Sequence, residues 1–116
     1  MNMNILPETY FKCLSDETRL RCLLLVYQYH QLCVCELSQA LNLAQPKISR
    51  HLTLLRHHQI LQDIRLGQWV YYQLHPNLPE WSKEIVAISA KTAYENKLYQ
   101  QDVIRLQALK INSPYC

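Results

Sequence analysis

Two short runs of apolar residues with helical spacing lie next to each other near the middle of the sequence. The spacing predicts one helix over about 34–42 and a second over about 45–58. Pro46 falls in the first turn of the second helix, where proline is tolerated because that turn does not need its N–H. Two short helices joined only by the segment NLAQ are the sequence form of a helix-turn-helix. The apolar positions are Val34, Leu37 and Leu41 in the first run, and Ile48, Leu52 and Leu55 in the second.

The N-terminal part of the chain predicts two further helices. Pro7 can open a short helix. The segment SDETRL then supplies a capping residue, Ser15 or Asp16, for a longer helix. Leucines recur at helical spacing after this cap, so the second helix should run to about His30.

The residue pattern changes after the second helix of the helix-turn-helix. The run ILQDIRLGQWVYYQL is rich in β-branched and aromatic residues, which favour strands. Its middle holds Gly67, the only glycine in the chain. Hairpin turns often need a positive φ, which glycine adopts without steric cost. The sequence therefore predicts a β-hairpin, or wing, over about 61–74.

The C-terminal part contains neither proline nor glycine between Glu80 and about Leu109. It reads as one long helix, on the order of 45 Å at ~1.5 Å per residue. A domain of this size cannot cover such a helix along its whole length, so we expect a partner helix from a second copy of the chain. The alternative is a break near the segment TAYEN.

Together these elements predict one domain over residues 1–116, mainly α with a β-hairpin. Its fold class is a winged helix-turn-helix that forms a homodimer through its terminal helices. The N-terminus lacks the basic and apolar regions of a secretory signal, and the longest apolar run is too short to cross a bilayer. We therefore expect a cytoplasmic protein that makes no membrane contact.

The net charge of +3 lies in one third of the sequence. From Ala44 to His75, four basic residues face only one acidic residue, Asp63, and the rest of the chain is balanced. Four of the five histidines also fall in this segment. A basic segment in an otherwise neutral chain indicates a polyanionic partner, and its position on the predicted helix-turn-helix makes double-stranded DNA the expected one.

The second helix of the helix-turn-helix carries the polar side chains that could read DNA bases, and the wing adds a cation. Arg65, beside the glycine turn, could enter the minor groove or meet the phosphate backbone. The alternative is that these residues form only the solvated side of an amphipathic helix. The candidate DNA-binding residues are Gln45, Lys47, Ser49, Arg50, His51 and Arg65.

Two of the five cysteines, Cys33 and Cys35, are separated by one residue at the start of the first helix of the helix-turn-helix. In the cytosol, where thiols are kept reduced, close cysteines favour metal binding or redox chemistry over a disulfide framework. Residues two apart on a regular helix point about 200° apart. Both sulfurs can therefore hold one atom only if the first turn is loose. We also expect the helix N-terminus to favour the thiolate form.

The remaining cysteines have weaker cases as ligands. Cys22 falls inside an apolar helix and should belong to the core, Cys13 is undecided, and Cys116 is the last residue. Cys33 and Cys35 could themselves be small buried hydrophobes. An enzyme is disfavoured, because the chain has no C-x-x-C motif, no βαβ pattern and no phosphate-binding glycine loop.

Four strings, LSDETRLRCLLL, LCVCELSQAL, QPKISRHLTLLR and GQWVYYQL, resemble the ArsR/SmtB family of winged-helix repressors, in particular its arsenic-responsive branch. The resemblance implies a homodimeric repressor that binds its operator without a cofactor. It further implies release by trivalent arsenic or antimony bound to Cys33 and Cys35. The thiols themselves would also accept cadmium, lead or zinc, or respond to oxidation. The rival function is therefore a thiol-redox repressor of the same fold.

One position departs from the arsenic-responsive pattern. Family members often have a third cysteine three residues after the second, and this chain has Ser38 there. Either two thiols suffice, which would also suit organoarsenicals such as methylarsenite, or Cys13 or Cys116 supplies a third sulfur. The C-terminal helix has no histidine, so the family's second, zinc-binding site is not expected.

Overall fold

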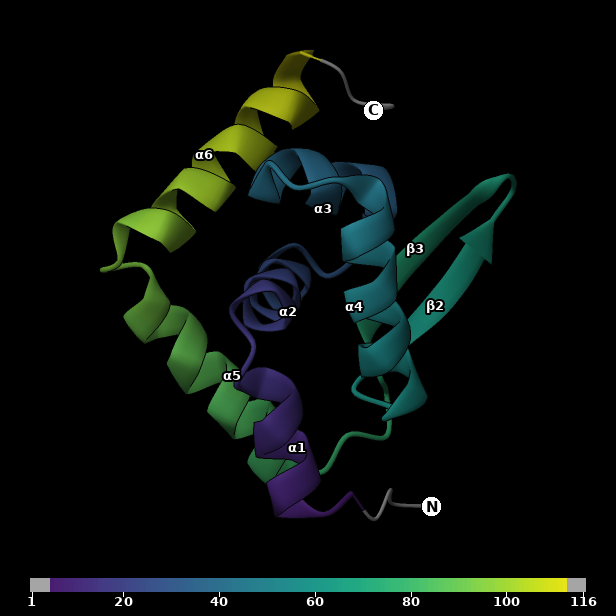
Figure 1. The fold of residues 1–116 in the computed structure, drawn as a ribbon, viewed down its shortest axis with the longest axis vertical. Coiled ribbons are helices and arrows are strands. Elements are labelled where there is room, and N and C mark those ends of the chain that lie inside the picture. The colour runs from purple at the N-terminus through teal and green to yellow at the C-terminus, as the bar shows by residue number, and fades with distance from the viewer. Residues whose placement is uncertain (1–4, 113–116) are drawn as a thin grey trace.

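The computed structural model describes residues 5–112 and consists mainly of helices, with one small antiparallel sheet (Figure 1). No helix in this part of the chain is both long and apolar enough to cross a membrane. The elements in chain order are α1 (Pro7–Leu14), α2 (Glu17–Tyr29), β1 (Leu32–Cys33), α3 (Val34–Leu41), α4 (Gln45–His57), β2 (Leu61–Leu66), β3 (Trp69–Leu74), α5 (Glu80–Ala93) and α6 (Lys97–Asn112).

Helix α2 lies in the middle of the molecule and begins where the sequence predicts. The side chain of Asp16 accepts a hydrogen bond from the backbone N–H of Arg19 at 3.0 Å, which caps the helix. Most of the α2 side chains from Thr18 to Val26 are buried, and α1, α3, α4 and α5 pack around them.

The helix-turn-helix forms from α3 and α4. Helix α3 ends at Asn42, which adopts the left-handed conformation with φ 57°, and asparagine tolerates this conformation better than most residues. The hydroxyl of Ser38 donates to the carbonyl of Leu43 at 2.5 Å and so closes the turn. The apolar stripe of α4 is buried against the core, as its spacing predicts.

The wing is the hairpin of β2 and β3, which projects from the body beside α4 (Figure 1). Leu66 pairs with Trp69, so the loop has two residues. Gly67 has φ 63°, and Gln68 has no positive φ, which is the pattern of a type II′ turn. The turn that the single glycine predicts is therefore confirmed.

The sheet has a third strand that the sequence pattern does not reveal. Strand β1 is only two residues long and pairs with β3, so the strand order is β1-β3-β2. In this register Leu32 lies opposite Tyr72, and Cys33 lies opposite Tyr71. The wing is thereby joined to the residue that precedes α3.

The prediction of one long C-terminal helix is wrong. The chain breaks between α5 and α6, at the segment named above as the alternative. The side chain of Asn96 accepts a hydrogen bond from the backbone N–H of Leu98 at 2.8 Å, and asparagine is a strong helix-capping residue. Because of the break, α6 turns back across α3 (Figure 1), and helix length no longer argues for a second copy.

A buried ionic cluster holds the C-terminal end of α3 against α2 and α6. Asp102 on α6 is 1% exposed and accepts hydrogen bonds from Arg21 at 2.7 and 2.9 Å and from Arg105 at 3.0 Å. Arg21 also donates to the carbonyl of Leu41 at 3.1 Å, and Arg105 donates to that of Ala40 at 2.7 Å. The hydrogen bond with Asp102 raises the pKa of Arg21. The cluster satisfies carbonyls that a helix end leaves without intrahelical partners.

Replacing Asp102 with alanine should destabilise the fold by about 3–5 kcal/mol, because it leaves the buried Arg21 charge without its carboxylate. Urea unfolding followed by circular dichroism measures this change. The matched control is Asp63→Ala, which removes a carboxylate from an exposed pair with Arg56 and should change stability by less than about 1 kcal/mol. Equal effects of the two substitutions would contradict the role of the cluster.

Candidate DNA-binding surface and thiol site

Helix α4 exposes a polar face near its start. Gln45, Lys47 and Arg50 are all exposed, and the helix contains no acidic residue. Lys47 and Arg50 are three residues apart, so they lie on neighbouring parts of the same face. Arg65 is exposed on β2 of the wing. The structure therefore places four of the six candidate DNA-binding residues at the surface of α4 and the wing.

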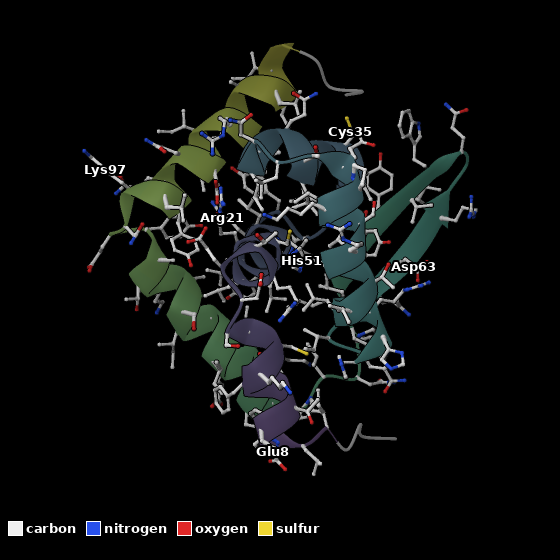
Figure 2. The ribbon with its side chains drawn as sticks, viewed as in Figure 1. Glu8, Arg21, Cys35, His51, Asp63 and Lys97 are labelled. Carbon is white, nitrogen blue, oxygen red and sulfur yellow. The ribbon has the colours of Figure 1, made fainter. Side chains whose placement is uncertain are left out.

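The other two candidates, Ser49 and His51, are partly buried. His51 faces the start of α2, between that helix and α4 (Figure 2). Its Nδ1 lies 3.3 Å from Nη1 of Arg19 and 3.8 Å from Oδ1 of Asp16. Burial and the neighbouring cations lower its pKa, although Asp16 opposes the shift. This geometry gives His51 a role in holding α4 against α2.

Cys33 lies where β1, β3 and α3 meet. It is the last residue of β1 and the N-cap of α3, with extended backbone angles (φ −90°, ψ 169°). Its backbone N–H donates to Oε1 of Glu36 at 3.0 Å, and its sulfur faces the backbone N–H of Glu36. This is a capping box in which sulfur replaces the usual hydroxyl oxygen. Because Cys33 lies outside the regular helix, the separation of about 200° does not apply to Cys33 and Cys35.

The N–H groups at the start of α3 favour the thiolate form of Cys33, as expected, but other effects on its pKa outweigh them. Burial raises the pKa of the Cys33 thiol, whose residue is 6% exposed, and the nearby Glu36 carboxylate raises it further. The N–H groups of Glu36 and Cys35 act in the opposite direction but do not outweigh these effects. Cys33 therefore carries its proton at neutral pH.

Cys35 lies in the first turn of α3, where it is partly exposed (Figure 2). It is disulfide-bonded in this structure, whereas Cys13, Cys22 and Cys33 are free thiols. Cys33 and Cys35 are not bonded to each other.

The other cysteines stand apart from this site. Cys22 is fully buried, and burial raises its pKa to about 12, which confirms its place in the core. Cys13 is buried beside a cavity that Arg19 and His58 help to line. Cys116 lies outside the described residues. Within residues 5–112, no three histidine, cysteine or acidic side chains come together in a way that could hold a metal ion.

Lys110, to which no sequence pattern points, ties this site to α6. Nζ of Lys110 lies 2.9 Å from Oε2 of Glu36 and 5.9 Å above the ring of Tyr29. Glu36 thus accepts from the backbone of Cys33 on one side and from α6 on the other. The spacing of Cys33 and Glu36 matches a capping box, and this local signal could have identified Glu36. Nothing local could have identified Lys110.

Comparison with known proteins gives a consistent family. The family described as "Bacterial regulatory protein, arsR family" matches residues 16–62. The arsenic resistance transcriptional regulator ArsR1 of Pseudomonas putida is 60% identical over 75 residues, which cover 65% of this chain and 59% of that protein. The arsenical resistance operon repressor of Escherichia coli is 50% identical over 82 residues, which cover 71% of this chain and 70% of that protein.

The fold also matches solved structures. Reduced HlyU from Vibrio cholerae superimposes with a TM-score of 0.66 at 27% sequence identity, covering 73% of this chain and 85% of HlyU. This similarity agrees with the arrangement of α3, α4 and the wing described above.

Proposed function

Because this chain belongs to the arsR family of bacterial regulatory proteins, we propose that it represses transcription by binding operator DNA as a homodimer. We further propose that trivalent arsenic or antimony, or an organoarsenical, binds Cys33 and Cys35 and releases the repressor. The observation that carries the second part is the position of Cys33, which pairs with the wing and caps α3, and whose capping partner Glu36 binds Lys110 of α6.

The DNA contacts are assigned to the exposed polar face of α4 and to the wing. Gln45, Lys47 and Arg50 lie on the first two turns of α4, from which a recognition helix reaches base edges in the major groove. Lysine and arginine pair with guanine there, and glutamine pairs with adenine. Arg65 meets the phosphate backbone or the adjacent minor groove. His51 supports the position of α4 through its contacts with Arg19 and Asp16.

Dimerisation is supported by apolar side chains that nothing in the described chain covers. Ile88 on α5 and both Ile104 and Ile111 on α6 are 65%, 62% and 80% exposed. Exposed apolar residues of this size on terminal helices favour a partner surface. A second copy of the chain would cover these side chains and would provide the second DNA-reading helix for a two-fold operator.

Two structural routes connect the thiols to the DNA-binding surface. Along the chain, α3 leads through the tight turn closed by Ser38 to α4. Across the sheet, Cys33 pairs with Tyr71 on β3 of the wing. A ligand that needs both sulfurs favours a state in which the sulfur cap of α3 is open. The ligand shifts the equilibrium between the closed and the open cap by the difference in its affinity for these two states.

The chemistry of the protonated Cys33 favours arsenous acid over divalent metals. Each thiol that exchanges with a hydroxyl of arsenous acid forms one S–As bond, and its proton leaves with that hydroxyl as water. No free proton is released in this exchange. Cadmium or zinc binding releases a proton from each thiol, so a raised pKa weakens it at neutral pH.

A redox repressor is the second candidate, and one observation favours it. Cys35 is disulfide-bonded in the structure, so its oxidation is compatible with the fold. Cys33 is a free thiol there, so this oxidation does not need the Cys33–Cys35 pair. For the arsenic proposal, Cys35 has to be reduced before a ligand binds both sulfurs.

Replacing Arg50 with alanine should weaken specific operator binding by about 1–3 kcal/mol, because a base contact is lost. Anisotropy of a labelled duplex containing the chain's own upstream region measures this. Lys97→Ala removes an exposed cation at the start of α6, on the side of the molecule away from α4 and the wing (Figure 2), and serves as the control for a general effect of lost positive charge. Unchanged operator affinity of Arg50→Ala would show that α4 reads DNA through other residues.

Replacing both Cys33 and Cys35 with serine should leave operator affinity near that of the wild type. Serine is a good N-cap residue and can keep the bond to the backbone N–H of Glu36. The wild type, fully reduced and freed of excess reductant, should leave the labelled operator when arsenite is added. The double-serine variant should stay bound.

Three comparisons separate the candidate inducers. Cys13→Ser should still respond to arsenite, because Cys13 lies outside the proposed site. Release by cadmium, but not by arsenite, should weaken as the pH falls from 8 to 6. If peroxide releases the wild type from operator DNA and arsenite does not release the reduced protein, the redox repressor is established instead. If arsenite releases the double-serine variant from operator DNA as it releases the wild type, neither thiol is needed for the response.

A further inference from the structure

The tip of the wing carries two large apolar side chains that no described part of the protein covers. Leu66 ends β2 and is 50% exposed, and Trp69 begins β3 and is 37% exposed. They flank the Gly67 turn and lie opposite each other in the strand register. A Cβ atom added to Gly67 would have no neighbouring atom within 4 Å, so the tip of the hairpin is open to solvent.

The strand register assigns these side chains to one face of the hairpin. Residues that lie opposite each other share a face, and successive residues along a strand alternate. Leu66 and Trp69 therefore share a face, and Arg65 lies on the other. That other face is the one turned toward α4, because Asp63 on it lies beside α4 (Figure 2) and pairs with Arg56 of that helix at 3.7 Å. The tip thus has a cationic face and an apolar face.

We propose that Leu66 and Trp69 enter the DNA minor groove beside the major groove read by α4, and pack there against sugars and base edges. This inference rests on the proposed DNA-binding function and adds an uncharged source of affinity to it. Apolar side chains inserted at minor-groove steps are a known means of binding and bending DNA.

The surroundings of the pair favour DNA over a protein partner. The tip projects from the same side of the molecule as α4, so it continues the proposed DNA surface (Figure 1). Arg65, on the opposite face of the same tip, supplies a charge that suits phosphates. A hairpin tip inserted into a groove presents its two faces to opposite walls, so one wall meets the cation and the other meets the apolar pair.

The salt dependence of binding separates the two kinds of contact. Trp69→Ser should raise the Kd for the operator about tenfold, because the burial of a large apolar side chain is lost. It should leave the slope of log Kd against log salt concentration unchanged, because no phosphate contact is lost. Arg65→Ala should reduce that slope by about 1. Trp69→Phe, which keeps an aromatic ring, should lose less affinity than Trp69→Ser, and Trp81→Phe should bind as the wild type does.

The groove itself can be tested by changing the DNA. In a duplex with G·C pairs at the wing position, the guanine amino group projects into the minor groove and should obstruct the apolar pair. Replacing those guanines with inosine removes the amino group and should restore wild-type affinity. Trp69→Ser should be much less sensitive to either change. Emission from Trp69 in a Trp81→Phe background should change when operator is added.

Each outcome decides the inference. Failure of the wild type to bind operator would overturn the proposed function itself. If the wild type binds but Trp69→Ser binds equally well, or loses salt slope as Arg65→Ala does, the apolar contact is refuted. If Trp69→Ser changes only the self-association of the protein in size-exclusion chromatography, the tip is a protein contact instead. Circular dichroism of Trp69→Ser confirms that the exposed substitution leaves the fold intact.

Discussion

The buried carboxylate of Asp102 is the interaction on which the placement of α3 depends. It holds Arg21 and Arg105, and these two side chains bind the last carbonyls of α3, so three helices meet at one charge cluster. A buried cluster with complete hydrogen bonding resists opening, because removing one partner leaves an uncompensated charge. The C-terminal end of α3, which leads into the DNA-reading helix, is therefore fixed.

The other end of α3 is held by weaker interactions. A sulfur atom replaces oxygen in its cap, and the Glu36 carboxylate is held by Lys110, which is exposed. Glu36 is buried, but it receives only one ammonium group and one backbone N–H, whereas Asp102 receives two guanidinium groups. A ligand that acts on Cys33 therefore acts on the end of α3 that opens more readily. Since Cys33 also pairs with Tyr71, opening there changes the connection between α3 and the wing while the cluster at Asp102 stays closed.

Local features of the sequence predict most of the fold. The cap at Asp16, the turn at Gly67 and the apolar stripes of α3 and α4 depend on near neighbours, so they can be read from short segments. The pairing of β1 with β3, the contact between Lys110 and Glu36, and the raised pKa of Cys33 depend on residues far apart in the chain. The break before Asn96 has no proline or glycine to mark it, and its only local sign is the capping preference of asparagine.

The most direct test of this account is amide hydrogen exchange of the reduced protein, without DNA, before and after one equivalent of arsenite. The account predicts faster exchange at residues 33–36 and in the paired part of β3 around Tyr71. It also predicts unchanged protection at Leu43, next to the end of α3 that the cluster at Asp102 holds. Unchanged exchange at 33–36, or opening that begins at the C-terminal end of α3, would contradict it.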